Sequence, residues 1–437
     1  MAVSRAAVWR DLMVIVLAGI ALRAFFLPAP GHVVDLNTFG QWALRAADAP
    51  WNQAYERTDA NYPPGAMLFF ELIGRGYRAF APVDPDRSIL RLALKAPNVL
   101  FDALGSFVLY ALARRFTTSH RRALLAAAIF AFNPAIVYDS ALWGQNDSIT
   151  TVSALAAIWC MVSRWRVAAW LLLAFAVLNK PPVLVLAPIF ALEAFLTSDL
   201  LERRRRIVQS TVGIGGAIAL GYVLALPFYT NWSFASVYGR MISWYQIGSS
   251  LYPYNSANAF NLYALFGDFF GSDTGTWFLV PLKYWADVAF IIVAALIFWR
   301  YTRVRDDRAL VEASFLVMLA FFLILTEMHE RYLIYALTFI PILAILDRRY
   351  LWCAAVLTLT QWLNLEYSLS YMWIESDKPP GINPHEFAPV LVHMCALANI
   401  GVFATVAGVY LGRTSGAALP AGANVRISEV PAYDARR

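Results

Sequence analysis

The sequence predicts an all-α polytopic membrane protein with about twelve transmembrane helices, eleven to thirteen in all. Of its 437 residues, 60% are hydrophobic and only 15% are charged, and the mean hydropathy is +0.55, which is far too apolar for an ordinary soluble domain. The arginines fall in short groups between apolar runs of spanning length. The net charge of +6 therefore indicates anchoring in a membrane and not binding of nucleic acid.

The individual spans follow from apolar segments of about 20 residues, which can cross the hydrocarbon core of roughly 30 Å as helices. The first, near 9–28, follows Arg5 and Arg10 like a signal peptide, but no small-residue cleavage site follows it, so we interpret it as an uncleaved span. The others lie near 91–113, 123–142, 149–163, 167–180, 183–197, 207–229, 277–299, 309–326, 331–346, 351–371 and 389–411.

The arginine groups orient this arrangement, because cytoplasmic loops carry an excess of Lys and Arg. With twelve spans, every group falls on the side of the N-terminus. We therefore expect a plasma membrane protein, of bacterial type, with both termini in the cytoplasm. Residues 1–413 form one transmembrane domain, and the Ala/Gly-rich segment 414–437 is a disordered tail. The groups are Arg114 to Arg122, Arg164 and Arg166, Arg203 to Arg206, Arg300 to Arg308, and Arg348 and Arg349.

Two long loops, 30–90 and 230–276, are then external. Within the first, 64–82 is apolar enough to pass for a span, but counting it would place the next arginine group outside. Three charged residues, Glu71, Arg75 and Arg78, share one face at helical spacing, as in a helix that lies in the membrane interface. With 30–90 kept as one loop, polar motifs hundreds of residues apart emerge together on the external face. Their convergence predicts an active site there.

Asp35 directly follows the first span. A carboxylate held at the membrane surface is a candidate general base, able to take a proton from an acceptor hydroxyl. The alternative is that Asp35 is the N-cap of a helix that begins near Leu36, since Asp is a favoured cap residue.

Two further motifs are candidates for shaping the site: one is rigid, and the other is rich in hydrogen-bonding groups. Tyr62-Pro63-Pro64 is a corner, because each proline fixes φ and extends the residue before it, and we expect Tyr62 to help shape the site. The turn Trp143-Gly144-Gln145-Asn146-Asp147-Ser148 offers an indole, two amides and a carboxylate between two spans. Its alternative role is capping of the next helix by Asn146 and Asp147.

Two cationic motifs complete the external set. Lys180, in Asn179-Lys180-Pro181-Pro182, lies on the side where the charge bias disfavours cations, as recognition of a phosphate would require, although a lysine at a helix end can also snorkel to the interface. His329, Glu330 and Arg331 can bind an anion or form a salt bridge. A metalloprotease is excluded because Leu333 stands where the second histidine of His-Glu-x-x-His would be.

Other motif types are not supported. Cys160, Cys353 and Cys395 each lie within an apolar run and lack the spacing of a disulfide framework or a zinc site. The glycines of 213–217 lie within a predicted span, where small residues let helices pack closely, so they do not indicate a nucleotide loop.

With these motifs in place, the chain resembles the GT-C superfamily of integral-membrane glycosyltransferases. Trp143 to Ser148, Lys180-Pro181 and Met328 to Tyr332 are similar to motifs of bacterial members related to GPI mannosyltransferases. Tyr62-Pro63-Pro64 and His329-Glu330 are also similar to dolichyl-phosphate-glucose glucosyltransferases.

The resemblance implies transfer of a hexose, mannose or glucose, from a polyprenyl-phosphate sugar to a lipid-linked or cell-envelope glycan acceptor. Asp35 would be the catalytic base. Lys180, His329 and Arg331 would bind the donor phosphate, with Tyr62, Trp143, Gln145, Asp147 and Glu330 supporting the site. Since Asp35 has no adjacent second acid, unlike several metal-dependent members, we expect no metal or other cofactor.

A transporter or flippase of a lipid-linked or polar solute is the alternative function. Transporters place charged groups near the bilayer midplane and show internal repeats. We see no clear repeat here, but polar residues inside two predicted spans favour this class: Lys95 and Asp102 in one, and Gln361, Asn364 and Glu366 in the other.

Overall fold

The computed structural model describes residues 4–81, 83–248, 251–267, 269–376 and 388–413, and within these ranges the chain is mostly helical. The N-terminal half contains α1 (Arg5–Phe26), α2 (Val33–Ala47), η1 (Trp51–Gln53), α3 (Ala54–Thr58), α4 (Pro64–Phe80), α5 (Ser88–Ala113), α6 (His120–Ala131), α7 (Pro134–Val137), the π-helical η2 (Tyr138–Trp143), α8 (Asp147–Val162), α9 (Arg166–Val177), η3 (Pro181–Leu186), α10 (Ala187–Glu193), α11 (Leu200–Ala225) and η4 (Leu226–Phe228). The C-terminal half contains α12 (Phe234–Gly248), β1 (Ser256–Ala257), η5 (Tyr263–Phe266), β2 (Thr276–Trp277), β3 (Val280–Pro281), α13 (Leu282–Val304), α14 (Asp307–Ile324), β4 (Met328–His329), η6 (Glu330–Leu333), α15 (Ile334–Leu337), α16 (Ile340–Leu346), α17 (Arg349–Ser376) and α18 (Pro389–Gly412).

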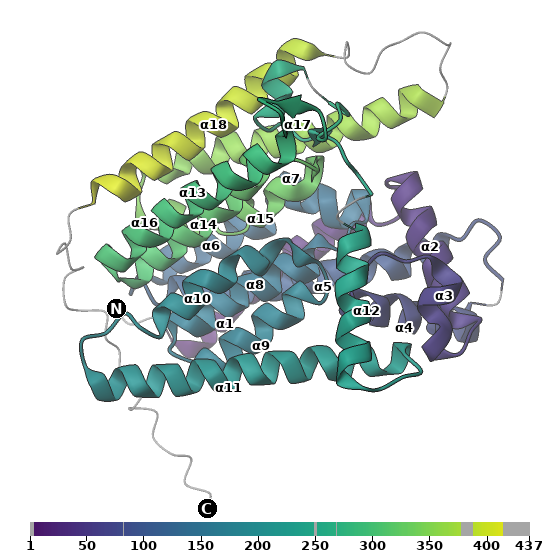
Figure 1. Cartoon of the computed structure of the whole chain (residues 1–437), viewed down its shortest axis with the longest axis horizontal. Coiled ribbons are helices and arrows are strands. Elements are labelled where there is room, and N and C mark those ends of the chain that lie inside the picture. The colour runs from purple at the N-terminus through teal and green to yellow at the C-terminus, as the bar shows by residue number, and fades with distance from the viewer. Residues whose placement is uncertain (1–3, 82, 249–250, 268, 377–387, 414–437) are drawn as a thin grey trace, which may run out of the picture.

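The long helices run roughly along one direction, and shorter elements close one end of the bundle. In Figure 1 the N-terminus lies near one end of α11, whereas α2, α3, α4 and α12 gather near its other end. Helix α12 stands across the direction of α11. The segment 30–90 is thus a layer of helices at one end of the bundle. Within α4, Glu71 and Arg75 share one face, as predicted, and form an i, i+4 ion pair at 2.5 Å.

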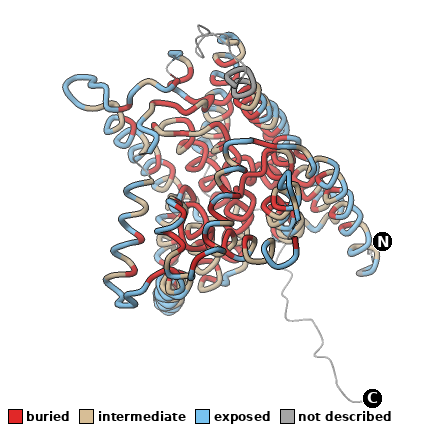
Figure 2. The backbone as a smooth tube through the Cα atoms, turned by 90° about the vertical axis from the view of Figure 1, so that its right-hand side faces the viewer, coloured by how far each residue is buried: buried red, intermediate tan, exposed pale blue. Residues whose placement is uncertain are grey.

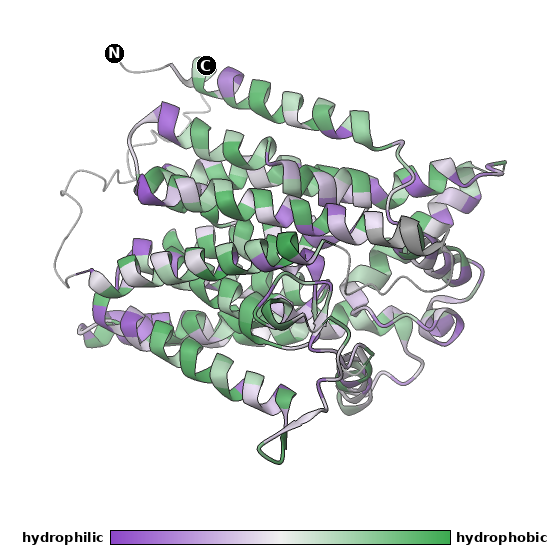
Figure 3. Ribbon diagram, turned by 90° about the horizontal axis from the view of Figure 1, so that it is seen from above, coloured by the Kyte–Doolittle hydropathy of each residue, from purple (hydrophilic) through white to green (hydrophobic). Residues whose placement is uncertain are grey.

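Within the described part of the chain, four helices are long and apolar enough to cross a membrane: α5, α11 continued by η4, α13 and α18. A fifth candidate is α6 together with the segment 134–143, which is bent by 43° at Asn133-Pro134. Figure 3 shows apolar residues along the middle of the long helices and polar residues near their ends. These helices indicate an integral membrane protein. The predicted number of twelve spans is not confirmed.

Several predicted spans differ from the structure for identifiable reasons. The span at 277–299 begins only at Leu282, because residues 276–281 form an antiparallel hairpin. The span at 331–346 is divided into η6, α15 and α16, and the span at 183–197 is a 3-10 turn followed by a seven-residue helix. Short, broken helices are tolerated at membrane depth where other protein segments, and not lipid, surround the backbone.

The core shows this shielding directly. Helix α14 is apolar on all sides and buried along most of its length, as expected for a helix enclosed by others. Figure 2 shows the buried residues concentrated in the middle of the bundle, with exposed residues on the outer helices. An enclosed helix contacts protein on every side, so it can be short and can carry paired charges.

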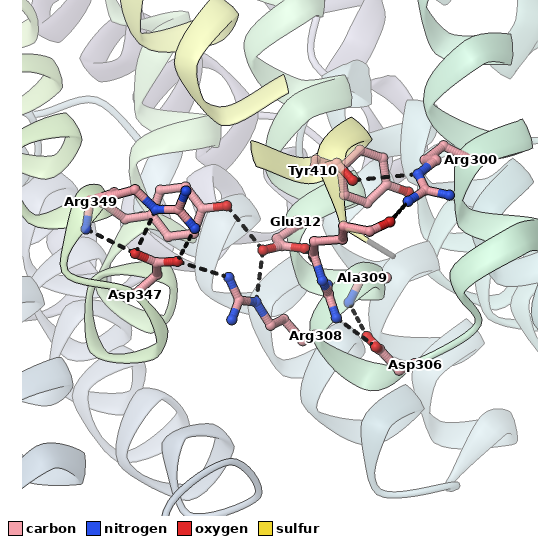
Figure 4. Close-up of polar contacts among 10 residues, drawn as sticks. Arg300, Asp306, Arg308, Ala309, Glu312, Asp347, Arg349 and Tyr410 are labelled. Carbon is pink, nitrogen blue, oxygen red and sulfur yellow. Dashed lines mark hydrogen bonds and ion pairs between the residues drawn. The ribbon is translucent and has the colours of Figure 1, made fainter. Parts of the chain in front are cut away.

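The end of the bundle distant from α2–α4 carries the arginine groups, which are paired with buried and half-buried carboxylates. Glu312 of α14 lies between Arg308 at 2.8 Å and Arg413 at 2.6 Å, and Asp347 lies between Arg308 and Arg349. Figure 4 shows Arg308 between the carboxyl groups of Glu312 and Asp347. Glu193 similarly lies within 4 Å of three arginines, one of which, Arg164, also forms an ion pair with Asp307 at 3.0 Å. Arginines far apart in sequence therefore share one end of the molecule, as the positive-inside pattern predicts.

The predicted membrane topology can be tested by cysteine labelling. Asp59→Cys and Thr274→Cys, both at exposed positions near the α2–α4 end, are expected to react with an impermeant maleimide added to intact cells. Arg204→Cys, exposed near the arginine end, is expected to react only after permeabilisation. The native cysteines are buried and can be replaced by Ala as the background. Labelling of position 204 in intact cells would contradict the predicted orientation.

Candidate active site

Asp35 lies in the first turn of α2, just after a tight turn that follows α1. Gly31 adopts φ of +71° there, and a Cβ on it would lie 2.6 Å from Leu36 Cδ1, so only glycine fits without strain. The N-cap of α2 is His32, whose Nδ1 accepts a hydrogen bond of 3.2 Å from the Asp35 backbone N–H. The interpretation of Asp35 as an N-cap is therefore wrong, and its carboxyl group is left for other contacts.

The carboxyl group of Asp35 is held from one side. Its Oδ2 accepts a hydrogen bond of 2.8 Å from Trp143 Nε1 and another from Gln145 Nε2. The His32 ring stacks on the Trp143 indole, with centroids 4.4 Å apart and planes at 7°. The Asp35 side chain stays 21% exposed, and within the described part of the chain nothing donates a hydrogen bond to Oδ1. One oxygen is thus fixed while the other remains available.

The same surroundings set the charge of Asp35. Burial raises the pKa of this carboxyl group. The positive charge of Arg331 lowers it, and so do His32 and the hydrogen bonds from Trp143 and Gln145. The lowering effects are the larger ones in sum. The resulting pKa lies below the usual range. Asp35 is therefore ionised at neutral pH.

Trp143 and Gln145 owe their positions to an irregular backbone. Residues 138–143 form a π-helical segment, a conformation that is rare and frequent at functional sites. It ends at Gly144, with φ of +91°, where a Cβ would lie 2.8 Å from Leu36 Cδ2. The backbone N–H of Gln145 donates to Asp139 O at 3.2 Å, which turns the chain toward α8. Asn146 occupies the N-cap position of α8 but makes no side-chain capping bond.

Gln145 joins Asp35 to Lys180. Its Nε2 donates to Asp35, and its Oε1 accepts a hydrogen bond of 2.9 Å from Lys180 Nζ. Lys180 Nζ also donates to Asp147 Oδ1 at 2.7 Å, and both members of this ion pair are buried. Lys180 therefore does not snorkel to the membrane surface. A carboxylate base and a cation are held within one hydrogen-bonded chain.

Arg331 approaches Asp147 from the opposite side. Its guanidinium forms an ion pair of 2.6 Å with Glu330 Oε1, and its Nε lies 3.8 Å from Asp147 Oδ2. Among the described residues, neither that Nε nor that Oδ2 has a hydrogen-bond partner, although both are buried. Tyr335 donates to the other oxygen of Asp147 at 2.6 Å. Buried polar atoms without partners are uncommon, so Arg331 retains unused donor capacity at the site.

Tyr62 covers this cluster. Lys180 Nζ lies 5.4 Å from the centroid of its ring, a cation–π contact. The backbone carbonyl of Tyr62 accepts a hydrogen bond of 2.8 Å from Tyr55 OH, and Pro63 and Pro64 then begin α4. The predicted rigid corner thus places an aromatic ring against the candidate phosphate-binding lysine.

His329 lies in β4, which pairs in parallel with β1 and so joins the 253–281 loop to the cluster. The centroid of its ring lies 4.6 Å from that of Tyr252 and 5.4 Å from that of Tyr332. Burial and then the charge of Arg331 hold the pKa of His329 well below its usual value. The imidazole is therefore neutral at pH 7 and offers an N–H donor, not a cation.

Glu327, in the same motif, pairs with a second acid. Burial, a hydrogen bond with Asp273 and the charge of that carboxyl group raise the pKa of Glu327 to about 7, while Lys283 opposes the shift and Asp287 adds to it. The backbone N–H of Glu327 also donates to Tyr254 O at 2.8 Å. This backbone hydrogen bond helps to hold the 253–281 loop against the motif.

This pair predicts a pH dependence of stability. Between pH 4.5 and about 7 the folded protein keeps a proton on Glu327 that the unfolded chain has released, so the free energy of unfolding falls as pH rises through this window. Glu327→Gln is expected to remove that slope, as measured by thermal unfolding in detergent. Glu56→Gln, at an exposed position of α3, serves as the control. An unchanged slope in Glu327→Gln would contradict the raised pKa of Glu327.

The predicted site residues therefore lie close together: Asp35, Tyr62, Trp143, Gln145, Asp147, Lys180, His329, Glu330 and Arg331. Sequence reasoning missed His32 and Tyr335. The only signal for Tyr335 was its position one helical turn after Arg331, and His32 gave none, since its role depends on the turn at Gly31. Within the described residues, no group of three or more His, Cys, Asp or Glu side chains is arranged to hold a metal ion. The absence of a cofactor remains a prediction.

Comparison with known proteins bears on the class of this site. Residues 90–229 match the family model described as dolichyl-phosphate-mannose-protein mannosyltransferase, a GT-C type family. The predicted resemblance to GT-C enzymes is confirmed. The matched segment contains Trp143, Gln145, Asp147 and Lys180. The match covers about a third of the chain, and it is a similarity to GT-C type enzymes over that segment.

Other comparisons add little. A similar solved structure is the apo oligosaccharyltransferase of Archaeoglobus fulgidus, with 13% identity and a TM-score of 0.46, covering 94% of this chain and 57% of that one. This chain thus spans little more than half the length of that protein. No curated protein matches.

Proposed function

We propose that this GT-C-type protein transfers a hexose, mannose or glucose, from a polyprenyl-phosphate sugar to a lipid-linked or cell-envelope acceptor at the external membrane face. The observation that carries the proposal is the bridge formed by Gln145, which links the Asp35 carboxylate to the Lys180 ammonium. A glycosyl transfer from a phosphate donor requires a base for the acceptor and cationic donors for the leaving phosphate.

The proposed reaction is a single inverting displacement. Asp35 accepts the proton of the acceptor hydroxyl on its available oxygen while that hydroxyl oxygen bonds to C1 of the sugar. The bond between C1 and the phosphate oxygen breaks, and the polyprenyl phosphate leaves with the electron pair. Trp143 and Gln145 keep the carboxylate oriented because both donate to the same oxygen, Oδ2.

The leaving phosphate gains charge during this step and is stabilised by donors already in place. In the proposal, Arg331 contributes its unpartnered Nε and Lys180 its ammonium group. Neutral His329 contributes an N–H. Asp147 and Glu330 orient the two cations and are not expected to contact the phosphate.

The residues that favoured a transporter have structural partners. Asp102 forms a buried ion pair with Arg23 at 2.6 Å, and Lys95 donates to the carbonyls of Leu27 and Ala29 at the end of α1. Lys95 is the eighth and Asp102 the fifteenth of the 26 residues of α5, so Lys95 lies toward the end nearer Asp35 and Asp102 near the middle of the helix, where Arg23 pairs with it. These charges therefore position α1 and the turn before Asp35, which favours the transferase.

The polar residues of α17 likewise fix loops of the site. Gln361 Nε2 donates to Glu330 O at 3.1 Å, and Asn364 accepts from the Phe260 backbone N–H at 2.9 Å. Glu366 accepts a hydrogen bond of 2.6 Å from Tyr138 OH in the π-helical segment. In the proposal, these residues act as supports for the catalytic groups.

The test is a membrane assay with radiolabelled polyprenyl-phosphate mannose and polyprenyl-phosphate glucose. Label is expected to move from one of these donors to a lipid or glycan acceptor fraction, and membranes carrying Asp35→Asn serve as the control. Movement of the intact donor across the bilayer without transfer of its sugar would contradict the transferase and favour a flippase.

A further inference from the structure

The hairpin formed by β2 and β3 has an unusual tip. Thr276 pairs with Pro281 and Trp277 with Val280, which leaves Phe278 and Leu279 as a two-residue turn. Both adopt positive φ, 49° and 68°. Two-residue turns of this kind strongly prefer Asn-Gly or similar pairs, because side chains with a Cβ are strained in the left-handed region. Bulky apolar residues are the least suitable choice for the backbone.

Packing does not explain the choice either. Phe278 is 76% exposed and Leu279 is 95% exposed, and Trp277 beside them is also exposed. The hairpin projects from the edge of the molecule (Figure 3). Side chains that neither suit their turn nor pack on the protein indicate contact with something outside it, since strain that is retained points to a function.

The location of the hairpin indicates which partner this is. Pro281 is followed at once by α13, a candidate membrane span. The first turn of α13 contains Lys283, Tyr284 and Trp285, a composition typical of the boundary between water and hydrocarbon. Trp285 Nε1 donates to Trp277 O at 2.9 Å, and the two indole rings lie 6.3 Å apart. The hairpin is thereby held at the level of the membrane interface.

We propose that the hairpin 276–281 is a membrane anchor, whose tip residues Phe278 and Leu279 insert among the phospholipid acyl chains of the bilayer. Trp277 and Trp285 lie at the headgroup level, where indole rings are favoured. Inserting the two tip side chains removes apolar surface from water, which offsets the strain of the turn.

The anchor is rigidly connected to the candidate active site. Leu282 N donates to Gly275 O at 2.9 Å, and Lys283 N donates to Asp273 O at 3.1 Å, so the start of α13 is tied to the loop. That loop carries β1, which pairs with the strand containing His329. If the proposed function holds, the inserted tip fixes the height of the site above the bilayer in which the lipid donor is embedded.

Insertion is measured without any reference to transfer. Leu279→Cys and Thr274→Cys, in a background with the three native cysteines replaced by Ala, are spin-labelled in phosphatidylcholine nanodiscs that hold one protein copy and no polyprenol. A label at position 279 is expected to collide mainly with lipid-soluble oxygen, and a label at position 274, at the base of the hairpin, mainly with a water-soluble nickel reagent. Equal exposure of both positions to the nickel reagent, as a protein partner or a second copy would require, overturns the proposal.

A second variant separates insertion from folding. Phe278→Asn with Leu279→Gly gives the residues that the turn itself prefers, so its melting temperature in detergent should equal or exceed that of the parent protein. A spin label at Thr276→Cys, the neighbouring hairpin position, should nevertheless move toward water in nanodiscs, with several-fold greater nickel accessibility in this variant than in the parent. An unchanged depth would overturn the anchor. Since neither readout uses sugar transfer, failure of the anchor and failure of the proposed function are distinguishable.

Discussion

Asp35→Asn is expected to lower the rate of sugar transfer about 10²-fold or more while leaving donor binding in place, the usual scale of a lost general base. The amide has nearly the same size, and its oxygen can still accept the hydrogen bonds from Trp143 and Gln145 that now reach Oδ2. Folding should be preserved because His32, and not Asp35, provides the side-chain cap of α2. The rate of transfer and the dissociation constant of the donor are both measured on purified protein.

Asp48→Asn is the matched control. Asp48 follows the last residue of the same helix, and its exposed side chain forms an ion pair with Arg78 at 2.5 Å. Because exposed ion pairs contribute little, this variant should behave like the parent protein in both assays. Near-normal transfer by Asp35→Asn would refute the base assignment and direct attention to Asp139, a buried acid near Asp147 whose carboxyl oxygens have no hydrogen-bond partner among the described residues.

Lys180→Met is expected to have the second large effect, on stability and on donor binding together. It leaves Asp147 as a buried carboxylate without its 2.7 Å partner, and breaking a buried pair in this way costs about 3–5 kcal/mol. If Lys180 also contacts the donor phosphate, affinity falls by roughly 10- to 100-fold, since a charged hydrogen bond contributes about 1.5–3 kcal/mol. Arg331→Ala is expected to weaken donor binding in the same direction.

The double variant Lys180→Met/Asp147→Asn separates these two effects. It removes both charges, and the amide oxygen introduced at position 147 can still accept the hydrogen bond from Tyr335, so most of the lost stability should return. Donor affinity should stay low if Lys180 binds the phosphate. Recovery of normal donor affinity in the double variant would mean that Lys180 serves only as the partner of Asp147.

The sequence by itself determined the membrane class and the composition of the candidate site. Long apolar runs avoid water only in lipid or in a large protein core, so they indicate a membrane protein. Loops rich in arginine lie on the cytoplasmic side of the membrane, so they indicate which loops are external. The sequence predicts the motifs around Asp35, Trp143, Lys180 and His329 on one face of the membrane, because the predicted topology assigns each loop to a side. Their catalytic roles remain proposals.

Only the tertiary structure decided how the chain is divided into helices and which contacts the polar groups make. The segments 183–197 and 331–346 read as spans by hydropathy. Segment 331–346 is buried among other helices, so it needs neither spanning length nor regular geometry. Segment 183–197 is a 3-10 turn and a short helix, and it keeps exposed side chains such as Leu184 and Phe195. The local sequence was compatible with Asp35 as the N-cap of α2. In the structure, the turn at Gly31 places His32 at the N-cap position instead. Contacts such as Gln145 between Asp35 and Lys180 join residues 35 to 110 positions apart, and no local pattern encodes them because packing alone brings such groups within hydrogen-bonding distance.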